Sequence, residues 1–146
     1  AQMTDALKAG QVDAMIIWEP YASIAVKNGD GKLVETSGEI LPGHPCCCVA
    51  AREDFIKIHP DELKAVLEAH ENATKFTNEN PAEAAKCLPE DIVPDQDLQA
   101  SVIKDTTFIS GLDSSYKQNV MAFMNLEVKL GLLKKPLTED QIFADL

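Results

Sequence analysis

The sequence has few aromatic residues, few basic residues and no long hydrophobic run. Aromatic residues make up 5% of the 146 positions, with one tryptophan and two tyrosines. Lysine and arginine number 13 against 24 acidic residues, so the formal net charge is -11. A chain this acidic lacks the basic stripe that neutralises phosphates, which argues against a nucleic-acid partner. No apolar stretch reaches the length of a membrane span.

Four cysteines are present, but they form no CxxC pair and no spacing typical of a zinc site. Three are consecutive, Cys46, Cys47 and Cys48, and the preferred interpretation is a buried strand of small apolar side chains. A redox or metal role with nearby His44 is the alternative, supported only by proximity. The sequence also lacks Ser-His-Asp, P-loop and metalloprotease patterns, which points away from an enzyme. We therefore predict no catalytic residue, no metal and no cofactor.

Helical periodicity and capping signals account for most of the chain. Gly10 is placed to end the first helix in a left-handed conformation, and a proline followed by acidic residues starts the longest helix at Pro60. The spacing of apolar residues predicts the others. The predicted helices lie before Gly10 and at 22–26, 60–76, 81–88, 98–103, 116–133 and near 142.

Short apolar runs predict a few strands between these helices. Residues 14–17 and 46–51 fit strands covered on both faces, and 33–34 and 106–111 are predicted to be briefly extended. The predicted fold class is therefore α/β, mostly helical with few short strands. Two or three strands cannot cover their own faces and edges, so we expect part of a larger α/β protein. The start at Ala1, inside a predicted helix, also suggests a fragment whose targeting signal lies upstream.

The best candidate for a ligand site is the turn formed by Trp18, Glu19, Pro20 and Tyr21, directly after the first predicted strand. In open α/β sheets, ligands bind beyond the carboxyl ends of the strands. The indole of Trp18 is suited to stack on a solute, with a core tryptophan at a domain edge as the equal alternative. Glu19 is suited to accept hydrogen bonds from an amine, or else it is a helix-start acid beside Pro20. Tyr21 adds a hydroxyl donor.

His44 is a further candidate ligand contact. It lies in residues 37–45, which carry two prolines and two glycines and are predicted to form an irregular connection. A role in fixing this loop is the preferred interpretation of the imidazole.

The order of several short motifs resembles the nitrate, sulfonate and taurine group of ABC-transporter solute-binding proteins. The similarity spans nearly the whole chain, and it rests on the order of the motifs because each one is short. The motifs are Ala6-Leu-Lys-Ala-Gly-Gln-Val-Asp-Ala, Trp18-Glu-Pro-Tyr, Ser37-Gly-Glu-Ile, Gly43-His-Pro-Cys-Cys, Arg52-Glu-Asp-Phe, His59-Pro-Asp, Asn80-Pro-Ala-Glu-Ala-Ala and Leu130-Gly-Leu-Leu.

The resemblance implies a two-lobed type II periplasmic-binding-protein fold, with this chain as its carboxyl-terminal half. Residues 1–41 would complete the second lobe, 42–51 would cross the hinge and form a strand, and 52–146 would be the helical part of the first lobe. Trp18, Glu19, Tyr21 and His44 would then face the cleft between the lobes. Without the upstream half we expect exposed apolar faces, and hence self-association or domain swapping.

The implied function is that of the solute-binding component of an ABC importer for a small sulfonate, nitrate, taurine or a related compound. Its partners are the solute and a membrane permease, and its location is periplasmic or otherwise extracytoplasmic, with a lipid anchor if the upstream signal encodes one. The alternative is an enzyme similar to thiamine pyrimidine-precursor synthases, which share the fold and carry a CCCFC motif. Here the cysteines are followed by Val49 and Ala50, so the final Phe-Cys is lacking and the enzyme ranks below the binding protein.

Overall fold

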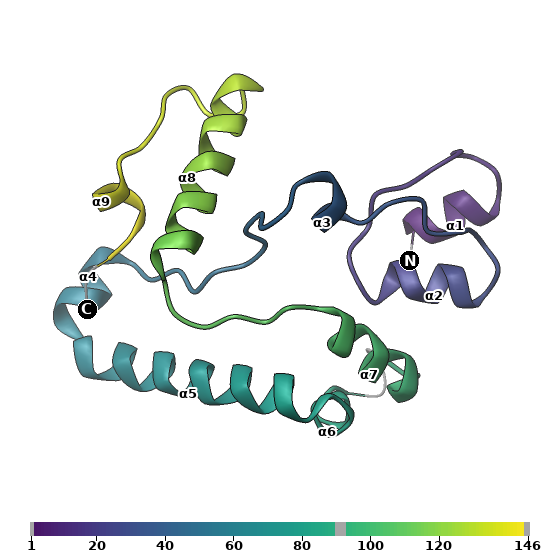
Figure 1. The fold of residues 1–146 in the computed structure, drawn as a ribbon, viewed down its shortest axis with the longest axis horizontal. Coiled ribbons are helices and arrows are strands. Elements are labelled where there is room, and N and C mark those ends of the chain that lie inside the picture. The colour runs from purple at the N-terminus through teal and green to yellow at the C-terminus, as the bar shows by residue number, and fades with distance from the viewer. Residues whose placement is uncertain (1, 90–92, 145–146) are drawn as a thin grey trace. The chain divides into compact units, whose positions relative to one another are not determined.

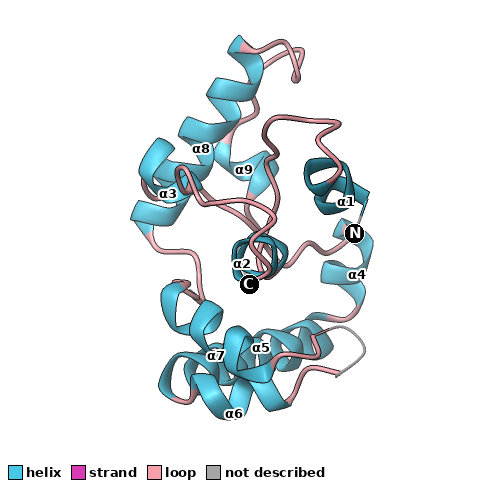
Figure 2. Cartoon of the chain, turned by 90° about the vertical axis from the view of Figure 1, so that its right-hand side faces the viewer, coloured by secondary structure: helices cyan, strands magenta, loops and turns pink. Residues whose placement is uncertain are grey.

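The computed structural model describes residues 2–89 and 93–144, and the structural statements below refer to these ranges. Within them the chain is largely helical and contains no β-strand (Figure 1, Figure 2). The helices are α1 (Gln2–Lys8), α2 (Tyr21–Lys27), α3 (Ser37–Ile40), α4 (Glu53–Ile58), α5 (Pro60–Glu79), α6 (Pro81–Lys86), α7 (Gln96–Asp105), α8 (Ser114–Lys129) and α9 (Glu139–Ile142).

The contacts divide the chain into two compact units. The first unit comprises residues 1–34 and 72–109, and the second comprises 35–71 and 110–146. Helices α1, α2, α6 and α7 belong to the first unit, and α3, α4, α8 and α9 belong to the second. Helix α5 contributes its first part to the second unit and its last part to the first. The division into lobes and hinge at residues 41 and 51 stays a prediction.

Glycine caps explain where α1 and α2 end. Gly10 has a φ of 67°, and its N–H donates to the carbonyl of Leu7 at 3.0 Å. The next N–H, from Gln11, donates to the carbonyl of Ala6 at 2.9 Å. These two bonds make a Schellman motif, whose left-handed residue is unstrained only as glycine. The predicted helix end at Gly10 is confirmed. Gly29, with a φ of 75°, follows α2 in the same left-handed conformation.

Helix α3 lies inside the connection that was predicted to be irregular, so that prediction is wrong for residues 37–40. Thr36 and Glu39 form a capping box, in which the Thr36 N–H donates to Glu39 Oε2 at 2.7 Å and the Glu39 N–H donates to Thr36 Oγ1 at 3.3 Å. The bond from the Thr36 N–H, followed by the bond from its hydroxyl, lowers the pKa of Glu39. The Thr-x-x-Glu spacing is the sequence signal for this helix.

The core of the first unit is small and lies where α6 packs on α7. Ala84 and Ala85 on α6 are buried together with Ile103 on α7, and the half-buried Ala100 packs against them. Alanine offers only a methyl group, so Ile103 supplies most of the apolar surface that this cluster removes from water. The stability of the α6–α7 pair therefore depends strongly on one isoleucine.

In the second unit, the segment 43–47, which includes the first two consecutive cysteines, lies against α8. The hydroxyl of Tyr116 donates to the carbonyl of Cys47 at 3.2 Å. Gly43 lies so close to α8 that a Cβ added to it would stand 2.8 Å from Asn119 Nδ2. Residues 116 and 119 are one helical turn apart and share a face of α8, so this single face holds both ends of the segment 43–47.

The predicted strands are wrong within the described ranges. Residues 14–17 and 46–51 form no strand pairing, and the side chain of Ile16 is 93% exposed. Residues 33–34 and 106–111, which are predicted only to be extended, lie outside the helices, and the side chain of Val34 is 88% exposed. A strand is stabilised by hydrogen bonds and side-chain contacts with a neighbouring strand. None of these runs has such a neighbour among the described residues. Of the predicted fold class, the mostly helical character is confirmed.

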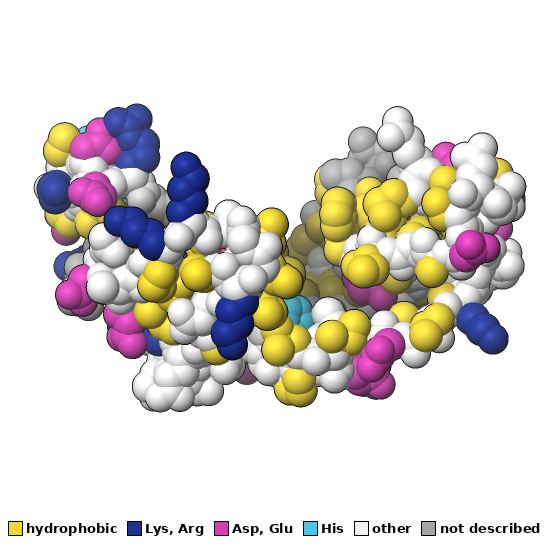
Figure 3. Space-filling model, turned by 90° about the horizontal axis from the view of Figure 1, so that it is seen from above, with side chains coloured by type: hydrophobic (Ala, Val, Ile, Leu, Met, Phe, Trp, Pro, Cys, Tyr) yellow, Lys and Arg dark blue, Asp and Glu magenta, His cyan; other side chains and the backbone are white. Residues whose placement is uncertain are grey.

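The cysteine run is exposed, which corrects the interpretation of a buried strand. Cys46, Cys47, Cys48 and Cys87 are all exposed free thiols. The physical reason is the missing neighbouring strand, since an extended segment buries alternate side chains only when a second element covers it. Figure 3 shows hydrophobic side chains, the class that includes cysteine, on the face that it draws.

Asp95 joins α2 to the start of α7. One carboxylate oxygen accepts the N–H of Leu98 at 3.0 Å as a helix cap, and the other contacts Lys27 Nζ. The hydrogen bond from Lys27, followed by the Leu98 N–H, lowers the pKa of Asp95. Because the folded-state pKa is the lower one, this stabilisation is present above the unfolded-state pKa of about 3.9 and is lost as the pH falls through the folded-state value.

We expect Asp95→Asn to lower the urea midpoint of the first unit slightly at neutral pH, because the amide oxygen keeps the cap while the ion pair with Lys27 is lost. The difference from wild type should be smaller at an acid pH below the folded-state pKa of Asp95, where the carboxyl group is protonated in both states. Urea unfolding followed by circular dichroism at both pH values measures this. Asp97→Asn, which removes an exposed charge from the same helix turn, is the matched control. An equal effect of Asp95→Asn at both pH values would contradict a contribution from the ion pair.

Candidate functional site

Trp18 and Tyr21 form an aromatic corner where α2 begins. Their rings are arranged edge to face, with centroids 6.5 Å apart and an interplanar angle of 77°. The Tyr21 N–H donates to the Trp18 carbonyl at 3.2 Å, and the Glu19–Pro20 peptide is cis. Trp18 is 73% exposed, so the alternative of a core tryptophan is wrong. We call residues 18–21 the aromatic turn.

Glu19 closes the amino-terminal end of α2. Its Oε2 accepts the N–H of Ser23 at 3.1 Å. Pro20 stands at the N-cap and makes no side-chain cap bond, so the neighbouring carboxylate satisfies a first-turn N–H in its place. The negative charge also lies at the positive end of the helix dipole. The helix-start role of Glu19 is therefore observed, and this carboxylate occupies a position where the helix end would otherwise attract an anion.

His44 belongs to the second unit, whereas the aromatic turn belongs to the first. The His44 ring is half-buried, and its Nδ1 lies 2.9 Å from the carbonyl oxygen of Leu41. The backbone N–H of His44 donates to the same oxygen at 3.2 Å. Both contacts fix the turn that follows α3, which agrees with a loop-fixing role. The structure thus places Trp18, Glu19 and Tyr21 together in one turn, and their binding role stays a prediction, as does that of His44.

The two side chains with a raised pKa, Cys46 and Tyr116, lie at the cysteine run. A hydrogen bond to Cys47, followed by burial, raises the pKa of Cys46. Burial, followed by the nearby cysteine thiols, raises the pKa of Tyr116. Among the residues that the structure describes, no three His, Cys, Asp or Glu side chains are grouped so that they could hold a metal ion. The Cys46 thiol and the Tyr116 phenol are therefore both less acidic than these groups usually are.

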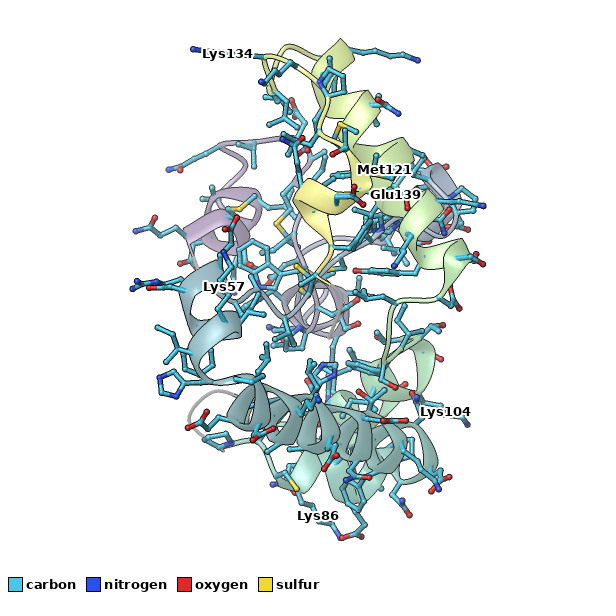
Figure 4. All side chains as sticks on the ribbon, turned by 90° about the vertical axis from the view of Figure 1, so that its left-hand side faces the viewer. Lys57, Lys86, Lys104, Met121, Lys134 and Glu139 are labelled. Atoms are coloured by element: carbon cyan, nitrogen blue, oxygen red, sulfur yellow. The ribbon has the colours of Figure 1, made fainter. Side chains whose placement is uncertain are left out.

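An open hollow between α8 and α9 holds charged side chains that sequence reasoning missed. Its volume is about 270 Å³, and its lining residues are Lys117, Glu139, Asp140, Phe143 and Ala144. Lys117 Nζ lies 5.3 Å from the centroid of the Phe143 ring, a cation–π distance. Figure 4 labels Glu139 at the start of α9. No motif brings residues so far apart in sequence together, so the sequence holds no signal for this hollow.

The sequence model of the NMT1-like family matches residues 1–89. The chain belongs to the NMT1-like family. This match covers more than half of the chain and includes the aromatic turn, His44 and the cysteine run. The resemblance to nitrate, sulfonate and taurine solute-binding proteins is thereby confirmed at the level of the family.

Curated relatives match parts of the chain. A putative aliphatic sulfonates-binding protein of Bacillus subtilis is 29% identical over 105 residues, which are 72% of this NMT1-like chain and 31% of the relative. A nitrate import ATP-binding protein of Synechocystis is 36% identical over 74 residues, 48% of this chain and 11% of the relative. A bicarbonate transport ATP-binding protein of the same organism is 38% identical over 73 residues, 47% of this chain and 11% of the relative. The matched stretches are thus less than a third of each relative's length.

The chain matches no solved structure. Among the described residues, no helix is both long enough and apolar enough to span a membrane.

Proposed function

We propose that this NMT1-like chain is part of the solute-binding component of an ABC importer. The solute is a small sulfonate, nitrate, taurine or a related nitrogen or sulfur compound. The observation that carries the proposal is the family match over residues 1–89, which contains an exposed aromatic turn. The Bacillus subtilis relative supports the sulfonate class through its name. Two lobes close around the solute in the full-length protein, which is extracytoplasmic and delivers its solute to a membrane permease.

The aromatic turn is one wall of the solute site in this proposal. The indole of Trp18 covers the apolar part of the solute, and the edge-to-face contact with Tyr21 holds its orientation. The Trp18 side chain is 73% exposed, so its indole is accessible to a stacking solute. His44 remains a predicted contact from the second unit.

The charge of Glu19 narrows the solute class. The carboxylate is exposed except for its bond to Ser23, so it repels a bare anion such as nitrate that approaches the turn. It attracts the ammonium group of a zwitterion such as taurine. The aromatic turn therefore favours an amino-sulfonate over a simple inorganic anion.

We expect Trp18→Ala to weaken taurine binding about tenfold, or about 1.4 kcal/mol, because the stacking surface is lost. Isothermal titration calorimetry of the full-length protein with taurine, ethanesulfonate and nitrate measures this. Phe55→Ala on α4 is the matched control, since Phe55 is an exposed aromatic residue of the second unit. An unchanged affinity of Trp18→Ala for every bound solute would show that the turn is not the site.

A second variant separates the roles of Glu19. In Glu19→Gln the amide oxygen still accepts the Ser23 N–H, so the start of α2 is preserved while the charge is lost. This variant should weaken taurine binding and leave ethanesulfonate binding unchanged or improved. The enzyme alternative, a thiamine pyrimidine-precursor synthase, predicts instead iron bound by the cysteine run.

A further inference from the structure

The consecutive cysteine thiols are reactive groups that have no role in the proposed solute binding. Cys46 and Cys47 are exposed and free, and their Sγ atoms lie 3.5 Å apart. Helix α8 lies against this segment, with the Tyr116 hydroxyl donating to the Cys47 carbonyl and the Asn119 side chain packed close to Gly43. The two thiols therefore stand side by side on a supported segment.

A disulfide between these two cysteines is disfavoured by chain geometry. Adjacent Cα atoms across a trans peptide are about 3.8 Å apart, whereas disulfides join Cα atoms about 4.4–6.8 Å apart. The peptide between Cys46 and Cys47 is trans. Direct oxidation of the pair would distort the backbone, so an unstrained link between the two sulfurs requires an inserted atom.

The observed sulfur separation fits a single bridging atom. Two bonds of about 2.3 Å, the length of a zinc–thiolate bond, span 3.5 Å when the angle between them is about 100°. That angle suits a pyramidal three-coordinate centre, whereas a linear two-coordinate ion needs a separation of about 4.6 Å with the same bonds. A closed structural metal site needs four protein ligands. No group of three or more such side chains is present in the described ranges.

We propose that Cys46 and Cys47 form a dithiol site for trivalent arsenic, a soft thiophilic centre that needs two thiolates and one further substituent. The reaction with an organoarsenous acid, R–As(OH)₂, breaks two As–O bonds and two S–H bonds. It forms two As–S bonds and releases two water molecules, with no change in the oxidation state of arsenic or sulfur. Soft thiolate ligands are the class that such a centre selects.

Cys48 and Cys87 lie outside the site. Cys87 is remote in sequence and belongs to the first unit, where its thiol donates to the Glu83 carbonyl at 3.5 Å. Cys48 is the next residue after the pair. Among the described residues, its Sγ makes no sulfur–sulfur contact like the one between Cys46 and Cys47. These two cysteines therefore serve as matched controls with the same chemistry.

The test is native mass spectrometry of the reduced chain with phenylarsine oxide. We expect one phenylarsenic group per chain, protection of two thiols from alkylation at Cys46 and Cys47, and release by a small 1,2-dithiol but not by a monothiol. Cys46→Ser and Cys47→Ser should each lower the affinity at least tenfold. Cys48→Ser and Cys87→Ser should leave it within about twofold of wild type. All four side chains are exposed, so circular dichroism should be unchanged in each variant.

Other outcomes overturn the proposal. Loss of the adduct in Cys48→Ser together with its retention in Cys47→Ser would place the site on Cys46 and Cys48. If the same thiols bound zinc stoichiometrically and more tightly than the phenylarsenic group, the site would serve a four-coordinate metal. A Cys46–Cys47 disulfide formed readily with glutathione disulfide would show that the pair is a redox couple. None of these results depends on solute binding at the aromatic turn.

Discussion

Replacing Ile103 by alanine is expected to destabilise the first unit by about 2–5 kcal/mol, the usual cost of truncating a buried large aliphatic side chain. Ile103 is 6% exposed and packs among Ala84, Ala85 and Ala100. The three alanines cannot reorient to fill the space, so the cavity stays open and the cost falls in the upper part of this range. Whole domains are stable by only about 5–15 kcal/mol, so this one change removes a large part of the total.

Hydrogen exchange of peptides that span α6 and α7 measures this change locally, which avoids assuming that both units unfold together. Ile109→Ala is the matched control, because Ile109 belongs to the same unit and is 51% exposed. It should change protection in α6 and α7 by no more than about 0.5 kcal/mol. Equal effects of the two substitutions would mean that the α6–α7 cluster does not act as the core of the first unit.

The helices were predictable because their signals are local. Pro60 begins α5, the longest helix, and Gly10 ends α1 with the hydrogen bonds that its left-handed conformation permits. The capping box of Thr138 and Gln141 is also formed, with the Thr138 N–H donating to Gln141 Oε1 at 3.0 Å. Such signals act within four residues of the helix end, so they do not require knowledge of distant segments. Helix ends were less well predicted: α8 stops at Lys129 and not at 133, whereas α5 continues to Glu79 beyond the predicted 76.

The strands were not predictable from the same sequence because their signals are incomplete. The pattern of a run such as 14–17 indicates that its side chains are apolar. It does not indicate which other part of the chain supplies the hydrogen-bonded partner strand. The same limit applies to Cys46–Cys48, whose burial was inferred from a strand that has no neighbour among the described residues. Exposed apolar side chains such as Ile16 and Val34 are the direct consequence.

The candidate site was predictable in part for the same reason. The aromatic pair of Trp18 and Tyr21 could be located from the sequence because the turn consists of four consecutive residues. The helix-start alternative for Glu19 agrees with the bond that its carboxylate accepts from the Ser23 N–H. The hollow lined by Lys117 and Phe143 joins residues far apart in sequence, and no periodicity or motif reports such a contact.

Glu19 shows how a structural role and a binding role can coexist. Its Oε2 satisfies the Ser23 N–H, and this contact holds the carboxylate at the start of α2. A charge that is fixed by a helix end loses less conformational entropy when it meets an ammonium group than a freely rotating side chain does. The helix-start role therefore pre-organises the amine-binding role that we propose.

Gly43→Ala is the second substitution with a large expected effect, because it introduces two separate costs. Gly43 has a φ of 71°, and the left-handed conformation costs an alanine about 1–2 kcal/mol. In addition, the new Cβ would stand 2.8 Å from Asn119 Nδ2, so the Asn119 side chain must move. We expect a total loss of about 2–3 kcal/mol in the second unit, measured by urea unfolding.

Two further variants separate these costs. Gly131 has a φ of 74° with no atom within 4 Å of a new Cβ, so Gly131→Ala carries only the conformational cost. The double variant Gly43→Ala with Asn119→Ala keeps the conformational cost and removes the steric one, so it should be more stable than the sum of its two single variants predicts. If Gly43→Ala lowers the free energy of unfolding by no more than Gly131→Ala does, then the Asn119 side chain moves aside without a measurable cost. The segment 43–47 is in that case held against α8 by Tyr116 alone, and the support of the dithiol pair depends on a single hydrogen bond.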